Sequence, residues 1–180
     1  MRPEDTICEE CGHRGLQESL EAGVRVLECP LCGGLGGDDE AVNRVLLARE
    51  AGERGFSLDL FLLVRELEAC RGIRVVTAED GDAWRGSWPR VEMEVDRKGL
   101  RQLSFLLRTL QIHRRELELS WRIELQLSPS GLLVHTLRPD FWSPPGRLTP
   151  EDLERAERDV STLARVVSLD RGLDWWVSIS

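Results

Sequence analysis

Two short stretches near the start of the chain, CEECGHRG at residues 8–15 and ECPLCGGLGG at residues 28–37, each contain a pair of cysteines with two residues between them. A turn of this length presents both sulfurs to one metal ion, and the interval between the pairs lies within the range of four-cysteine zinc sites. Four thiolates can also hold iron, so the spacing leaves the choice of metal open. We predict one structural Zn²⁺ bound by Cys8, Cys11, Cys29 and Cys32.

The segment between the pairs favours a β-hairpin. LQESL (16–20) and VRVLE (24–28) are expected to form two short strands around the turn EAG, and glycines follow both cysteine pairs, where the backbone must turn sharply. This stretch resembles the zinc-ribbon superfamily, in which two CPxCG-type knuckles flank a β-hairpin; CPLCGG matches the pattern, and CEECGH lacks the proline but keeps the glycine. The resemblance covers roughly residues 6–35 and implies a small module that is folded by zinc.

Redox chemistry is the alternative use of a CxxC pair. It normally requires a pair at the start of a helix beside a sheet, and the sequence around these cysteines does not predict that context. A site closed by four thiolates leaves no position for a substrate, so we expect the metal to have a structural role.

The composition indicates a folded protein of the cell interior. The chain has 180 residues, enough for one ordinary domain and a small module, and its 41% of apolar residues can build a core. The N-terminus has no apolar segment typical of a secretory signal, and no apolar run reaches the roughly 20 residues that cross a bilayer. We therefore expect a soluble, cytoplasmic protein that does not act at a membrane.

The elements predicted beyond the ribbon indicate an α+β fold. Helices are expected at 40–50, 57–70, 98–112 and from 149 onward, and strands at 72–77, 90–95, 117–127, 132–137 and 173–180. From residue 89 the order strand, helix, strand, strand, helix, strand is that of a ferredoxin-like (βαββαβ) sandwich, with parallel neighbouring strands. We divide the chain into a zinc ribbon (1–37), a helical linker (38–56) and a ferredoxin-like domain with extra N-terminal helices (57–180).

Two leucine patterns predict which side chains this domain buries. In the helix at 98–112, leucines at positions 100, 103, 107 and 110 share one face. In the stretch 117–127, apolar and polar residues alternate throughout, so we expect one buried face made by Leu117, Leu119, Trp121, Ile123, Leu125 and Leu127.

Two groups of residues are candidates for contacts with a partner. The tract 97–115 contains six basic residues and no acidic one, and Arg101, Arg108 and Arg115 recur every seven residues, so that they share a face while the helix continues. With Arg97, they could follow a phosphate backbone or meet an acidic protein, although neutralisation by neighbouring carboxylates is the simpler expectation. Trp84, Trp88 and Trp142 fall in predicted loops, where they either cap the core or anchor a partner.

Charge and the absence of a catalytic motif shape the functional hypothesis. The net charge is −8, and residues 1–37 carry three arginines against seven acidic residues, a balance that repels phosphate. No sequence motif pairs a nucleophile with a base, and none indicates a dedicated small-molecule site. We expect a non-enzymatic adaptor or accessory subunit acting through another protein. The alternative is an RNA-binding or RNA-processing accessory that uses the basic helix face at 97–115.

Overall fold

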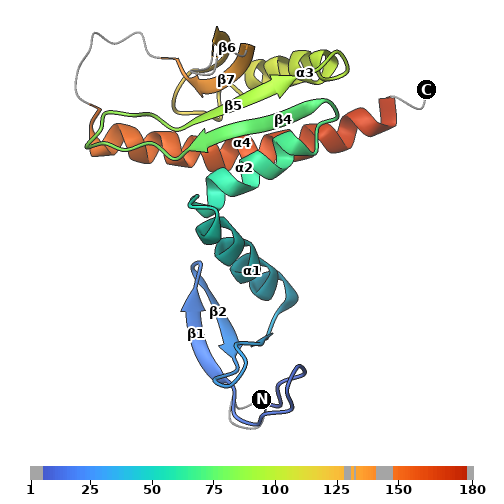
Figure 1. Ribbon diagram of the computed structural model, residues 1–180, viewed down its shortest axis with the longest axis vertical. Coiled ribbons are helices and arrows are strands. Elements are labelled where there is room, and N and C mark those ends of the chain that lie inside the picture. The colour runs from blue at the N-terminus through green and yellow to red at the C-terminus, as the bar shows by residue number, and fades with distance from the viewer. Residues whose placement is uncertain (1–5, 128–130, 132, 141–147, 178–180) are drawn as a thin grey trace. The chain divides into compact units, whose positions relative to one another are not determined.

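The chain divides into two compact units, Met1–Leu58 and Asp59–Ser180. The computed structural model describes residues 6–127, 131, 133–140 and 148–177, of which 171–177 are described by their backbone alone. Each unit contains one antiparallel sheet together with helices, so the fold is α+β as predicted (Figure 1).

The first unit is built on a three-stranded sheet in the order β1-β2-β3, from β1 (Gln17–Glu21), β2 (Val24–Glu28) and β3 (Leu35–Gly36). The predicted hairpin between the cysteine pairs is β1 and β2, joined by a two-residue turn. Ala22 and Gly23 in this turn both have positive φ, at 51° and 74°. Two such residues make a type I′ turn, whose twist matches that of the strands it joins.

Helix α1 (Asp39–Glu53) belongs to the same unit as the hairpin. It begins where the Asp38 carboxylate accepts a hydrogen bond from the Ala41 backbone N–H, an N-cap that satisfies a free donor of the first turn. Near its end, the Arg49 guanidinium binds Glu21 of β1 at 2.8 Å and Glu28 of β2 at 2.9 Å. This bridge ties the helix to both strands of the hairpin.

The second unit is a four-stranded antiparallel sheet in the order β4-β5-β7-β6, accompanied by three helices. Its elements are α2 (Leu58–Glu68), β4 (Ile73–Glu79), β5 (Arg90–Val95), α3 (Gly99–Ile112), β6 (Trp121–Leu127), β7 (Leu133–Pro139) and α4 (Pro150–Val177). Strand β7 lies between β5 and β6, so every paired neighbour is antiparallel. The prediction of parallel neighbouring strands is therefore wrong.

The prediction of a strand at 173–180 is also wrong for residues 173–177, because helix α4 extends to Val177. The place beside β5 that this strand would fill is occupied by β4 (Figure 1). The tryptophans and valine near the end of the chain favour a strand, but no free edge is left beside β5 to pair with them. A single glycine at position 172 costs only about 1 kcal/mol in a helix and does not end it.

The two faces of the second sheet differ in character because side chains alternate along each strand. One register row across the four strands is apolar, and the next row is polar. The apolar row is Ala78, Val91, Leu137 and Ile123, and the polar row is Thr77, Glu92, Thr136 and Glu124. Helix α4 contributes Ala156, Val160, Leu163 and Val167 to the core.

Helix α3 and strand β6 bury fewer leucines than the sequence predicts. In α3 the buried side chains are Leu106 and Thr109, whereas Leu100 and Leu107 are exposed. Leu117 and Leu119 precede β6, and at the other end of the strand Leu125 and Leu127 are 60% and 71% exposed. Alternation fixes which side chains share a face, but it does not determine how far along the strand that face is covered.

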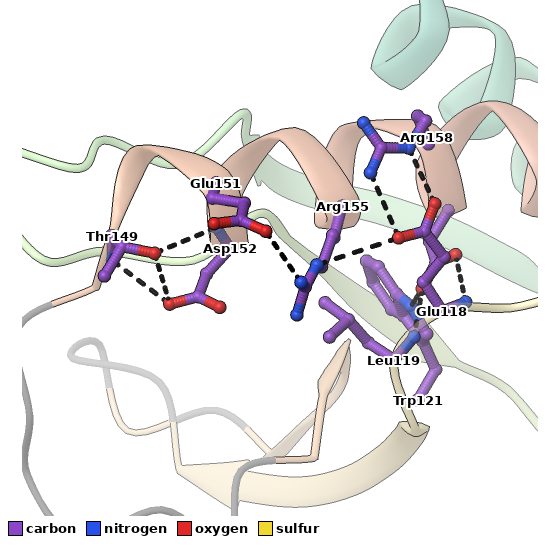
Figure 2. A network of polar contacts seen from close by, with 9 residues as sticks. Glu118, Leu119, Trp121, Thr149, Glu151, Asp152, Arg155 and Arg158 are labelled. Atoms are coloured by element: carbon purple, nitrogen blue, oxygen red, sulfur yellow. Dashed lines mark hydrogen bonds and ion pairs between the residues drawn. The ribbon is translucent and has the colours of Figure 1, made fainter.

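A buried carboxylate on α4 fixes the entry into β6. Asp159 is 1% exposed and accepts hydrogen bonds from the backbone N–H groups of Glu118 and Leu119 and from the indole N–H of Trp121, at 2.7–2.9 Å. On the surface beside it, Glu118 binds Arg158 through two guanidinium nitrogens (Figure 2). The approach to β6 is thus held by α4, and not by strand pairing.

Candidate functional site

The two cysteine pairs adopt the same backbone turn. The carbonyl of Cys8 accepts the N–H of Gly12, and the carbonyl of Cys29 accepts the N–H of Gly33, both at 2.9 Å. The two glycines have φ of 74° and 73°, a left-handed conformation that glycine adopts without steric cost. Repetition of this turn brings two equivalent knuckles to one place.

The four sulfurs of Cys8, Cys11, Cys29 and Cys32 all lie within 4.8 Å of one another. The Cys8 and Cys32 sulfurs are 3.6 Å apart, and those of Cys11 and Cys29 are 3.5 Å apart. A zinc ion with four sulfurs at about 2.3 Å places them about 3.8 Å from one another at the corners of a tetrahedron. The cysteines therefore form a group that could hold a metal ion, in the way that their spacing predicts.

Burial divides the four cysteines into two kinds. Cys8 and Cys29 are buried and pack with Leu16, while Cys11 and Cys32 are exposed. Desolvation opposes ionisation of the Cys29 thiol, but backbone N–H groups of Cys32 and Leu31 and the Cys11 thiol together lower the pKa of Cys29 to about 7. This environment favours the thiolate form, which is the form that binds metals.

Cys32 behaves in the opposite way. The Gly34 N–H lowers the pKa of the Cys32 thiol, but the neighbouring cysteines and desolvation outweigh it and raise that pKa to about 12. Four sulfurs this close repel one another as thiolates, so a cation is needed to ionise all of them together.

Gly34 is required by the packing of the site. A Cβ at this position would lie 3.1 Å from the Cys8 sulfur and 2.9 Å from a carboxylate oxygen of Glu10. The second glycine of CPLCGG therefore makes room for a ligand sulfur. Glu10 is a neighbour that sequence reasoning did not single out, with its carboxylate 3.9 Å from the Cys32 sulfur.

Three aliphatic side chains of the ribbon are exposed, two beside the cysteine pairs and one at the far end of the hairpin. Leu20, at the end of the hairpin, is 74% exposed, and Leu31, between the second pair of cysteines, is 73% exposed. Ile7, beside the first cysteine pair, is 49% exposed. Exposed acidic residues, among them Glu9 and Glu10, lie on the same module, so the ribbon carries both aliphatic and negatively charged exposed groups.

The basic tract 97–115 keeps its charge unneutralised. All six of its cations are exposed, and none forms an ion pair with any residue that the structure describes: Arg97, Lys98, Arg101, Arg108, Arg114 and Arg115. Neutralisation by neighbouring carboxylates, the simpler of the sequence-based expectations, is not observed within the described residues. Helix α3 ends at Ile112, so Arg115 lies beyond the helix face shared by Arg101 and Arg108.

A groove of about 640 Å³ lies between α3 and the start of β6. Its lining is mixed: aliphatic side chains lie beside polar and charged ones, which include Arg108 and Arg114 of the basic tract and the ion pair of Arg122 with Asp140. The aliphatic and aromatic lining comprises Leu107, Leu110, Leu117, Leu119, Trp121 and Ile123. Sequence reasoning missed this groove because it depends on where α3 lies against β6.

The tryptophans predicted to contact a partner differ in exposure. Trp84 is 99% exposed in a short loop closed by two backbone hydrogen bonds between Asp82 and Ser87. The Asp82 carboxylate also accepts the Trp84 backbone N–H at 2.8 Å. Trp88 is half-buried, and Trp142 lies outside the described residues.

Comparison of the chain with protein-family models, with curated proteins and with solved structures found no match. Among the helices that the structure describes, none combines the length and the apolar character that crossing a bilayer would require.

Proposed function

We propose that this protein is a non-enzymatic adaptor whose N-terminal ribbon, folded by zinc, docks on another protein. The observation that carries the proposal is the ribbon surface, where Leu20 and Leu31 are exposed on a module with an excess of acidic residues. Each of these leucines offers an apolar anchor to a protein partner, whereas the negative charge disfavours nucleic acid. The zinc has a structural role, because all four of its expected positions are taken by cysteines.

A pull-down from an extract of the source organism tests this function. Tagged wild-type protein is expected to retain a partner in stoichiometric amount, and Leu20→Ser with Leu31→Ser is expected to reduce its recovery about tenfold, because the apolar contacts are lost. Quantitative mass spectrometry identifies and measures the partner. Leu169→Ser, which changes a similarly exposed leucine on α4, serves as the matched control. Equal recovery with all three proteins, or no partner at all, contradicts the proposal.

RNA binding is the second candidate, and the unpaired cations of the tract 97–115 favour it. Phosphate contacts of this kind weaken steeply with salt because counterions are released on binding. If the tract follows a phosphate backbone, fluorescence anisotropy with single-stranded RNA should give a salt slope that becomes shallower by about 2 when Arg101, Arg108 and Arg115 are replaced by alanine. No binding at low salt by the zinc-loaded protein removes RNA as a direct ligand.

We also infer a relation between the second unit and the ferredoxin-like fold. Strands β5, β6 and β7 with helices α3 and α4 keep the order expected for the first five elements of that fold, and β4 stands where its last strand would lie. A cyclic change in the order of the elements, with the last strand moved to the front, accounts for both observations.

A further inference from the structure

The two edges of the second sheet differ in how they are protected. At one edge, the pairing of β4 shifts register between Val75 and Thr77, an irregularity that discourages pairing with another chain. At the other edge, β6 pairs with β7 in continuous register along its whole length of 7 residues and contains no proline. Among the described residues no strand pairs with the outer side of β6. This edge therefore offers a regular template for one more strand.

The backbone groups on that outer side can be assigned from the pairing. The Asp140 N–H donates to the Ser120 carbonyl, so these two residues form a hydrogen-bonded pair at the start of the ladder. In an antiparallel ladder such pairs alternate with pairs that are not bonded to each other. Arg122, Glu124 and Gln126 therefore bond to β7, whereas the N–H and C=O groups of Ile123 and Leu125 point away from the sheet.

The groove between α3 and β6 lies where side chains of an added strand would go. A strand paired with β6 lies about 4.8 Å from it and sends alternate side chains toward α3. There they meet Leu107, Leu117 and Leu119. Leu125 and Leu127, which the sequence predicts to be buried, would lose much of their exposed surface to the same strand. Both ends of β6 thus present aliphatic surface to an extended partner.

Arg108 and Arg114 determine the charge of this partner. Both line the groove, and neither forms an ion pair with a described residue. A second copy of the chain paired through its own β6 would bring a second set of these arginines to the interface, where like charges repel. Only every second side chain of an added strand faces α3, so acidic and aliphatic residues must follow one another at those positions. A segment of this pattern supplies carboxylates for the arginines and apolar side chains for the leucines.

Nucleic acid fits this groove less well than such a segment does. Bases bound by proteins without sequence preference usually stack on aromatic side chains. The aromatic residue that lines the groove is Trp121, which is buried and has its indole N–H bonded to Asp159. The leucines of the lining suit valine or leucine side chains of a peptide.

From this combination of an open edge, a groove with leucines in its lining and two unpaired cations beside them, we propose that β6 is a docking site for an extended acidic segment of a partner protein. The segment pairs with β6 as a fifth strand, with its aliphatic side chains in the groove and its carboxylates at Arg108 and Arg114. The inference rests on the proposed adaptor function in taking a protein as the partner, but it concerns a surface of the second unit and not the ribbon.

A labelled peptide of the length of β6, 7 residues with the sequence Val-Thr-Glu-Thr-Val-Thr-Glu, serves as the probe for the full-length protein, because it presents valine and glutamate in turn on one face. Fluorescence anisotropy is expected to show saturable binding that weakens as salt rises. Leu125→Pro removes an outward N–H that the added strand needs and is expected to weaken binding about tenfold, while Leu125→Thr, which keeps that N–H, changes it little. Equal affinity of the proline and threonine variants overturns the proposal.

Arg108→Ala with Arg114→Ala is expected to weaken binding about tenfold and to flatten the salt dependence. Arg14→Ala with Arg25→Ala removes the same charge from exposed positions of the ribbon and is the matched control. If the proline variant fails to fold, a peptide methylated on its edge-facing backbone nitrogens replaces it, and undiminished binding of that peptide overturns the proposal. The proposal is also overturned if single-stranded RNA competes with the peptide and binds more tightly, because the arginines would then be phosphate contacts.

The ribbon variant Leu20→Ser with Leu31→Ser keeps the second unit intact and is expected to bind the peptide like the wild type. Loss of the extract partner with peptide binding intact supports both proposals. Peptide binding without any extract partner overturns the ribbon function alone, and an extract partner without peptide binding overturns the edge site alone.

Discussion

Asp159 shows how much of this domain depends on one side chain. Its carboxylate is buried and accepts three hydrogen bonds from the chain that leads into β6. Without the carboxylate all three N–H groups would lose their partner, and for the indole N–H of Trp121, which is buried, such a loss costs about 1–3 kcal/mol. The sequence predicts the helix on which Asp159 lies, but it gives no signal that this residue points inward.

Replacement of this carboxylate by an amide is therefore expected to destabilise the protein. Asp159→Asn keeps the size of the side chain but puts an NH₂ group against N–H donors, and we expect a loss of about 2–3 kcal/mol in the free energy of unfolding. Urea denaturation followed by tryptophan fluorescence measures the loss. Glu154→Gln, an exposed change on the same helix, is the control, and equal stability of the two variants would show that Asp159 has no special role.

At the scale of elements, His113 joins the end of α3 to α4. Its Nδ1 lies 2.6 Å from a carboxylate oxygen of Glu116, and its Nε2 lies 3.4 Å from Asp170, which also accepts the Thr109 hydroxyl at 2.8 Å. The hydrogen bond with Glu116 and the interactions with Asp170 raise the pKa of His113 against a smaller effect of desolvation. Glu116, bonded to His113 and to Arg165, has a lowered pKa and stays ionised.

The stability that His113 contributes should depend on pH. Because its pKa is higher in the folded than in the unfolded protein, the stabilisation is fully present below about pH 6.5 and is lost as pH rises through the folded-state pKa. The difference in unfolding free energy between wild type and His113→Gln is therefore expected to be larger at pH 5.5 than at pH 8.5, by about 1 kcal/mol or less for a partly exposed group. A difference that does not change with pH would show that the pKa of His113 is not raised in the folded protein.

The elements that the sequence predicts well are those whose local signals agree. The hairpin β1–β2 and strand β5 combine alternation with turn residues, and α2 combines apolar periodicity with breaks on both sides. The last predicted strand is part of α4, and the place beside β5 that it would fill is taken by β4, which sequence periodicity cannot report. The exposure of Leu125 and Leu127 has the same origin, since coverage depends on how far α3 extends over β6.

The metal site was predictable, whereas the groove was not. Four cysteines at fixed spacing carry their geometry within two short turns, and the structure brings their sulfurs together. The groove at β6 combines residues of a helix and of a strand whose packing the sequence does not determine. The basic tract is an intermediate case: the sequence indicates its residues, but only the structure shows that they form no ion pair with the described residues.

For the molecule as a whole, the metal is expected to support one unit and not the other. Cys8, Leu16 and Cys29 form the small core of the ribbon, with Leu27 partly buried against it, so little apolar surface holds the hairpin without a metal. Zinc bound by four thiolates supplies on the order of 10–16 kcal/mol at neutral pH. The sheet of the second unit has its own core, which includes Phe61, Met93 and Leu163.

Removal of the metal by a chelator should therefore unfold the hairpin selectively. Hydrogen exchange measured by mass spectrometry is expected to show loss of protection in residues 17–28, while residues 90–95 remain protected. Elemental analysis before and after chelation relates the change to about one zinc per chain. A hairpin that stays protected without metal, or a second unit that loses protection with it, would contradict this division.

The unpaired arginines beside the open edge of β6 also bear on how the protein behaves when concentrated. An exposed, regular edge strand with leucines at its end is a common starting point for aggregation. Arg108 and Arg114 oppose this association, because two molecules that approach edge to edge bring these positive charges together. At 1 M salt the screening length falls to about 3 Å, so this repulsion is lost at high salt. The protein should therefore resist aggregation best in dilute buffer.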